Sequence, residues 1–76
     1  MGEFLFIIPE GWIQLDWQHI TNNLPNMGGP YVTSLLQSGV LMDIEATLKE
    51  GGVIPAESSL IDAKLFNDEL FIIKLG

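Results

Sequence analysis

The sequence predicts a single small domain, residues 1–76, with an α+β or mainly β fold built on a small antiparallel sheet or a barrel-like sandwich. The chain has 76 residues and is 47% hydrophobic, which suits one compact core and leaves no room for a second. Residues 4–17 and 60–75 are rich in branched and aromatic side chains, as strands are, and turn residues divide each stretch. The expected architecture is an N-terminal and a C-terminal hairpin with one or two short helices between them.

The N-terminal hairpin is expected from residues 4–8 and 12–17, with Pro-Glu-Gly at 9–11 as the turn. Residues 4–8 are apolar on both faces, which is typical of a strand covered on both sides. Residues 12–16 alternate between apolar and polar side chains, as a half-buried strand does. A second interpretation starts a helix with Asp16 as its N-cap, and both interpretations stay open for residues 17–23.

The middle of the chain predicts a loop and then helices. Residues 22–30 hold three Asn, two Pro and two Gly, which predicts a long loop. Residues 30–37 begin with a proline suited to a first helical turn. Residues 40–50 predict the better helix, because apolar residues recur at helical spacing and Gly-Gly follows. An alternating pattern leaves a strand over residues 39–46 as the alternative.

The C-terminal hairpin is expected from residues 60–66 and 69–75. The Asn-Asp pair at 67–68 tolerates the positive φ angles of a type I′ turn. A two-residue turn sets a register in which Lys64 opposes Phe71. The expected apolar face comprises Ile61, Ala63, Leu65, Leu70 and Ile72, and the expected mixed face includes Phe66, Phe71 and Ile73.

One four-residue sequence occurs twice, since residues 5–8 and 70–73 both read Leu-Phe-Ile-Ile. The simpler interpretation is coincidence in a strand-rich chain. The alternative is that two similar strands occupy equivalent places, pairing with each other or with copies in another subunit. Uncharged segments of this kind promote aggregation when they are left as open edges, so this chain or a partner must cover them.

Residue types that carry catalysis or bind metals are few. The chain has no cysteine, which excludes disulfides, thiolate metal sites and a cysteine nucleophile, and it has one histidine. His19 and Asp16 form part of a serine triad on paper, but no G-x-S-x-G motif positions a nucleophile. The acidic residues at 43–45 and 67–69 match no calcium-binding loop. We therefore expect no enzyme activity, no catalytic or metal-binding residue and no cofactor.

The charge balance restricts the classes of partner. Ten acidic residues against three lysines give a formal charge of −7, which disfavours direct nucleic-acid binding. The longest apolar run is far shorter than the ~20 residues that span a bilayer, so no membrane span is expected. The acidic start also lacks the basic residues of a signal peptide, and the cellular location is left open.

The leading functional hypothesis is a non-enzymatic protein interaction or assembly module, a small structural or accessory subunit of a larger homo- or hetero-oligomer such as a viral particle. Apolar strands in a short chain without disulfides or metals motivate it, because such domains are commonly stabilised by association. The alternative is an acidic inhibitor or regulator, for example a nucleic-acid mimic, that binds a basic site on a target protein. The candidate interface residues are Phe4, Phe6, Trp12, Trp17, Tyr31, Phe71 and Ile73.

Overall fold

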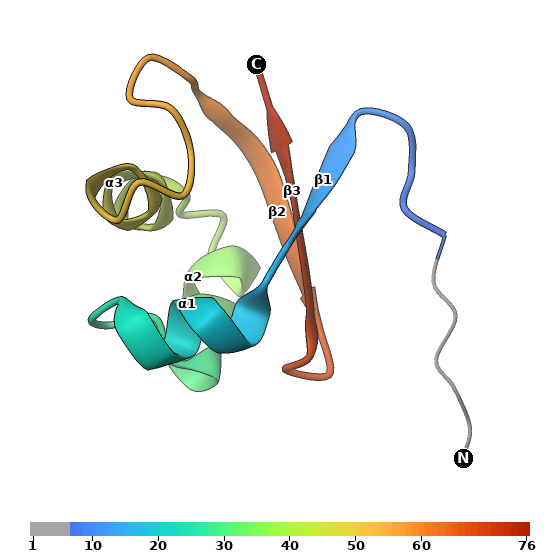
Figure 1. Cartoon of the computed structure of the whole chain (residues 1–76). Helices are drawn as coiled ribbons and strands as arrows, with labels where there is room; N and C mark the ends of the chain where they lie inside the picture. The colour runs from blue at the N-terminus through green and yellow to red at the C-terminus, as the bar shows by residue number, and fades with distance from the viewer. Residues whose placement is uncertain (1–6) are drawn as a thin grey trace.

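The structure, a computed structural model, describes residues 7–76, and these residues form one open sheet with helices on one side of it (Figure 1). The elements are β1 Trp12–Leu15, α1 Trp17–Asn23, α2 Gly29–Gln37, α3 Met42–Glu50, β2 Leu60–Phe66 and β3 Leu70–Leu75. The strands are antiparallel in the order β1-β3-β2. The predicted α+β fold with an antiparallel sheet is confirmed. The barrel-like alternative is wrong, because β1 and β2 do not pair and the sheet stays open.

β1 pairs with β3, from the other end of the chain. Leu15 lies opposite Phe71 in this pairing, so β1 places apolar side chains on the same face of the sheet as the core of β3. The N–H of Trp12 donates to the carbonyl of Pro9 over 3.1 Å, which closes the expected turn. Ile7 and Ile8 are not part of a strand, and residues 4–6 of the predicted first strand lie outside the described residues.

The helix interpretation holds directly after β1. The carboxylate of Asp16 accepts the N–H of His19 over 3.2 Å and so caps α1. α1 buries Trp17 and Ile20 against the sheet, and the predicted loop is therefore shorter than expected at its start. A side chain that satisfies an otherwise unpaired N–H stabilises the start of a helix, which is why the chain turns from strand to helix here.

α2 and α3 confirm the two helices predicted in the middle of the chain. α2 has a proline in its first turn, and it buries Val32. α3 buries Ile44 and Leu48, and its exposed side carries an ion pair of 2.8 Å between Lys49 and Glu45. The alternative of a strand over residues 39–46 is wrong, because the apolar residues of this segment meet the core at helical spacing.

Gly28 is the N-cap of α2 and offers no side-chain cap. Gly28→Ser is expected to raise the free energy of unfolding by about 0.5 kcal/mol, because a serine hydroxyl would accept a first-turn N–H. Chemical denaturation measures the change. Gly39→Ser is the matched control, since both glycines have open space around a Cβ but Gly39 has a φ of +74° and should lose stability. Equal effects of the two substitutions would contradict the expectation.

The C-terminal hairpin is confirmed, but its predicted register is wrong by one residue. Asn67 and Asp68 have φ angles of 54° and 56°, as the turn requires. Glu69 is also part of the turn, so Leu65 rather than Lys64 lies opposite Phe71. A shift of one residue moves side chains to the other face of a sheet, and Phe71 therefore faces the helices instead of the mixed face.

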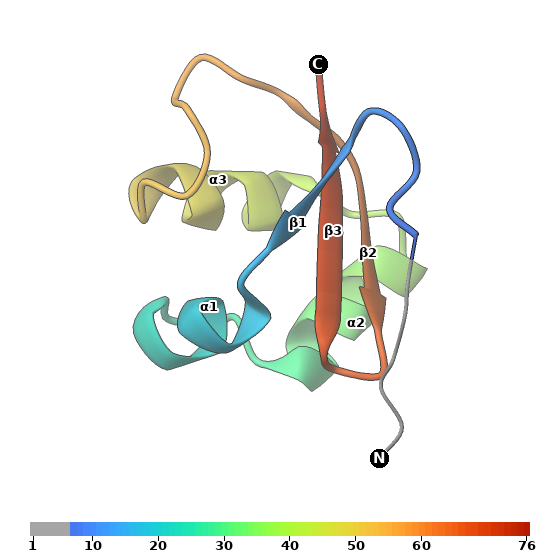
Figure 2. The same cartoon turned by 45° about the vertical axis from the view of Figure 1, so that its right-hand side comes forward.

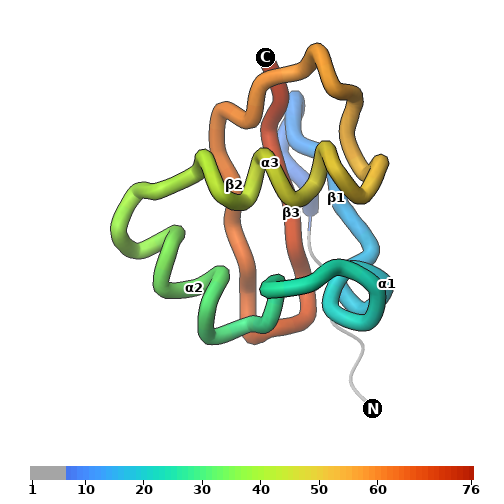
Figure 3. The backbone as a smooth tube through the Cα atoms, turned by 90° about the vertical axis from the view of Figure 1, so that its left-hand side faces the viewer, coloured from blue at the N-terminus to red at the C-terminus, as the bar shows by residue number. Residues whose placement is uncertain are grey.

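The core lies between the sheet and the three helices, and β3 runs through the centre of the sheet (Figures 2 and 3). The rings of Trp17 and Phe71 meet edge to face with centroids 5.1 Å apart. Leu70 and Ile72 are also buried, but they lie outside the core cluster, on the face of β3 that the helices do not cover. The core residues are Trp17, Ile20, Met27, Val32, Ile44, Leu48, Ile54, Leu60, Ala63, Phe71 and Ile73.

Candidate functional site

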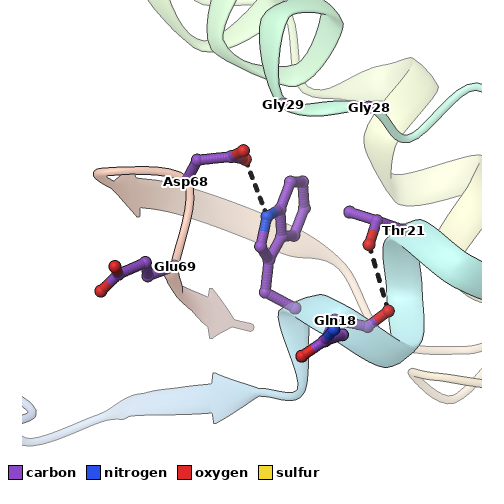
Figure 4. Close-up of a pocket in the computed structure, with 7 residues that line it drawn as sticks. Gln18, Thr21, Gly28, Gly29, Asp68 and Glu69 are labelled. Atoms are coloured by element: carbon purple, nitrogen blue, oxygen red, sulfur yellow. Dashed lines mark hydrogen bonds between the residues drawn. The ribbon is translucent and has the colours of Figure 1, made fainter.

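Three adjoining hollows follow α2 where it lies beside the β2–β3 hairpin, and together they form what we call the α2 groove. The first, about 440 Å³, reaches from Trp17 on α1 to Asp68 on the hairpin turn (Figure 4). The second, about 330 Å³, shares Asp68 with the first. The third, about 310 Å³, shares Thr33 with the second and continues along β2. The three hollows adjoin one another, because each shares lining residues with the next.

The first hollow is organised by a hydrogen bond between a buried indole and a turn carboxylate. Nε1 of Trp17 donates to Oδ1 of Asp68 over 2.9 Å (Figure 4). The same carboxylate lies so close to Gly29 that a Cβ there would collide with it. Gly29 is the first residue of α2, where the helix dipole favours a negative charge. Asp68 therefore joins α1, α2 and the hairpin, which is a structural role.

The third hollow runs along the edge of a strand. Four consecutive residues of β2, from Ala63 to Phe66, line it together with Thr33, Leu36 and Gln37 of α2. Consecutive strand residues point to opposite faces of a sheet, so a hollow that touches all four follows the edge of the strand itself. Among the described strands, β2 pairs only with β3, and its other side faces this hollow.

One backbone donor marks this edge. The N–H of Ala63 donates to the carboxylate of Asp62 over 2.8 Å, a side-chain acceptor on the same strand. Alternate residues of an antiparallel strand direct their N–H groups to opposite sides, so this bond identifies Ala63, and with it Leu65, as residues that face the open edge. The charged Asp62 thus occupies a donor that another strand could use, which is a common protection of edge strands.

The face of the sheet without helices has its own aromatic contact. Nζ of Lys64 lies 5.6 Å from the centre of the Trp12 ring, and the two residues come from the two edge strands. Lys64 lies opposite Ile72 on β3, so the contact crosses over the central strand. A cation over an indole face contributes about 0.5–1 kcal/mol at such a site. Trp12 therefore has a contact within the chain.

The predicted interface residues are scattered by the fold. Trp17, Phe71 and Ile73 lie in the core, where their side chains are at most 6% exposed. Trp12 is half-buried on the helix-free face, and Tyr31 is exposed on α2. Phe4 and Phe6 lie outside the described residues.

The α2 groove was missed in the sequence because its third hollow depends on β2 being an edge strand. Of its residues, Ala63 and Leu65 were placed on an apolar face in the sequence and not at a candidate interface, and Thr33 carries no sequence signal at all. The one available signal was the charge of Asp62 and Lys64 within an apolar strand, since charged residues are typical of strand edges.

The residues considered for catalysis have structural roles. The Asp16 carboxylate caps α1, and the ring of His19 lies 3.2 Å from the side-chain nitrogen of Asn23. Within residues 7–76, no three histidine or acidic side chains come together in a group that could hold a metal ion. No helix in this part of the chain is long and apolar enough to cross a bilayer.

Comparisons of this chain with models of protein families, with curated proteins and with solved structures found no match.

Proposed function

We propose that this chain is a non-enzymatic protein interaction or assembly module, and that it binds an extended protein segment along β2 in the α2 groove. The observation that supports the proposal is the third hollow, which exposes the edge of β2 beside a helix. Addition of a strand to a sheet edge is a recurrent mode of peptide recognition. Main-chain hydrogen bonds supply affinity in this mode, and side-chain hollows supply specificity.

The lining of the third hollow suits a short apolar segment. Leu36 and Leu65 are half-buried hydrophobic residues packed against the core, and they form an apolar wall there. Ala63 has the smallest side chain of β2 and is itself buried in the core at the base of this hollow. A hollow of about 310 Å³ holds few side chains, so the interface is small and of the weak or transient kind.

Strand addition here requires one specific exchange of hydrogen bonds. A partner carbonyl must replace the Asp62 carboxylate as acceptor for the N–H of Ala63. The released carboxylate is at the surface, where water solvates it. A segment with an acidic residue opposite Asp62 would be repelled, so the edge selects against acidic partners.

The test is selection of extended peptides from a random library on the full chain, followed by NMR mapping of the binding site. Selected peptides should shift the amide signals of Ala63 and Leu65. Thr33→Arg should weaken their binding about tenfold or more, because the long side chain fills the groove. Ala46→Arg is the matched control, since it changes the charge equally at an exposed helical position outside the groove, and it should leave binding within about twofold.

Two results would contradict the proposal. One is that selected peptides map away from β2 and α2. The other is that Thr33→Arg has no more effect than Ala46→Arg. Binding that instead ignores both substitutions and weakens steeply with salt would favour the acidic inhibitor, because exposed charge pairs are screened by salt.

A further inference from the structure

We infer that the segment added to β2 is residues 5–8 of a second copy of this chain, an inference that rests on the proposed function and names its partner. Residues 5–8 have the same sequence as residues 70–73 of β3. β3 is the strand that β2 already pairs with, on its other side. Residues 5–8 therefore carry the same set of side chains that β2 accepts as a neighbour.

The pairing of β2 with β3 supplies a register for the second copy. In the structure, Phe71 lies opposite Leu65, and Ile73 lies opposite Ala63. The same antiparallel order places Phe6 of the second copy opposite Leu65 and its Ile8 opposite Ala63. Phe6 and Ile8 would then point to the helix side of the sheet, where the third hollow has its apolar wall.

The backbone of the second copy fits the same register. Ala63 and Leu65 face the open edge, so their N–H and C=O groups would bond to Ile8 and Phe6 of the added strand. At a hydrogen-bonded pair of an antiparallel ladder, each residue donates its N–H to the C=O of the residue opposite. The N–H and C=O groups of the next residue along each strand point to the other side of that strand. A four-residue segment therefore forms a short ladder without leaving the facing groups of β2 unpaired.

The chain enters β1 through a tight turn, and β1 is the edge of the described sheet opposite β2. Three residues separate Ile8 from Trp12, and they close a tight turn through the bond of 3.1 Å between Trp12 and Pro9. β1 and β2 are opposite edges of the sheet, and a strand outside β2 would lie about 14 Å from β1 at the usual strand spacing. Figure 1 shows the described residues before β1, 7–11, on the side of the sheet away from the helices.

The described part of the donor segment, residues 7 and 8, is in no strand of its own chain. Ile7 is 89% exposed, the highest value among the large hydrophobic residues of the described chain, and it is not part of a strand. Residues 7 and 8 therefore have no described strand partner, and the acceptor edge of β2 lies elsewhere in the fold.

Donor and acceptor are different surfaces, so the contact is head-to-tail. Each copy would give residues 5–8 to a neighbour and receive a neighbour's at β2, which closes a dimer when the exchange is reciprocal and otherwise generates a larger ring or an open chain of subunits. Each copy carries a formal charge of −7, so the copies repel one another at low salt. Salt should therefore strengthen assembly, the opposite of its effect on an acidic inhibitor bound to a basic target.

The experiment is light scattering on the full chain and on donor and acceptor variants. The average mass of the wild type should rise above the 8.4 kDa monomer with concentration and with salt. Phe6→Lys removes the donor, and Ala63→Pro removes the backbone donor at the acceptor edge; each variant alone should remain monomeric. An equimolar mixture of the two should form a 1:1 heterodimer, because each supplies what the other lacks.

Two further variants make the test specific. Thr33→Arg blocks the groove without altering β2, so it should remain monomeric as Ala63→Pro does. Circular dichroism shows whether Ala63→Pro is folded. Phe4→Lys is the matched control for Phe6→Lys, since it makes the same change at a position that falls opposite the turn and beyond β2. It should keep association within about threefold of the wild type.

The inference is overturned if the wild type stays monomeric at every concentration and salt, if Phe6→Lys associates as the wild type does, or if the mixture stays monomeric. Peptide selection separates this failure from failure of the proposed function. A monomeric chain that still binds selected peptides at β2, with sensitivity to Thr33→Arg, retains the interaction function and rejects the second copy as the partner. If the chain neither associates with itself nor binds selected peptides at β2, both the second copy as partner and the proposed interaction function are rejected.

Discussion

Replacing Phe71 by alanine is expected to lower the free energy of unfolding by about 4 kcal/mol. The side chain is fully buried on the central strand, and its ring meets Trp17 edge to face at 5.1 Å. Its neighbours across the sheet are Leu15 on one side and Leu65 on the other, so its loss opens a cavity at the point where both strand pairs meet. A domain of this size has roughly 5 kcal/mol of stability, so most of the fold would be lost at 37 °C.

Urea denaturation followed by tryptophan fluorescence and far-UV circular dichroism measures this effect. Phe71→Leu fills most of the cavity and should cost only about 1–1.5 kcal/mol. Met42→Ala is the surface control, since Met42 is 79% exposed, and it should change stability by less than about 0.5 kcal/mol. A loss below about 1 kcal/mol for Phe71→Ala would show that β3 is not the centre of the core.

Gly29→Ala is expected to lower the free energy of unfolding by about 1.5 kcal/mol, although alanine favours helices. The new Cβ would collide with the carboxylate of Asp68, which must then leave the indole N–H of Trp17. An unsatisfied buried donor costs about 1–3 kcal/mol, and helix propensity and lower entropy of the unfolded chain return at most about 1 kcal/mol. The loss of this hydrogen bond therefore outweighs the gain in helix propensity, and Gly29→Ala lowers the free energy of unfolding.

A double-mutant cycle isolates this collision. Asp68→Gly removes the carboxylate and tolerates the φ of 56° at this position. In that background Gly29→Ala should be neutral or stabilising, which gives a coupling energy above about 1 kcal/mol. Gly28→Ala is the matched control, because a Cβ at Gly28 meets nothing within 4 Å, and it should show no coupling with Asp68→Gly. Equal coupling at the two glycines would contradict the proposed collision.

Local rules predicted α2, α3 and the hairpin turn, and they offered α1 as one of two interpretations. Asp16 at the start of α1, the proline in the first turn of α2 and the Asn-Asp turn of the hairpin each act through contacts within four residues. Interactions of this range are present in the sequence itself, because the partners are adjacent in the chain whatever the rest of the fold does. The α+β class follows from the same local patterns.

Strand pairing could not be derived with the same certainty. The expected partner of β1 was the segment directly before it, most of which lies outside the described residues, and nothing in the sequence indicated that β3, from the other end of the chain, pairs with β1. One additional turn residue, Glu69, shifted the hairpin register and moved Phe71 from an expected mixed face into the core. The pairing of β1 with β3 and the contact of Phe71 with Trp17 join segments far apart in the sequence, and a strand pattern read along one chain does not contain such contacts.

The candidate site depends on tertiary structure more than the fold class does. Trp17 and Asp68, which form one end of the α2 groove, are 51 residues apart in sequence. Composition by itself determined that this chain has few groups for catalysis and much apolar surface to cover, and local pattern determined its helices and turns. The tertiary structure alone decided that β3 lies between the other strands, because its side chains are apolar on both faces and only the central position buries both. That placement leaves β2 with an open edge beside α2, where we propose that a second chain binds.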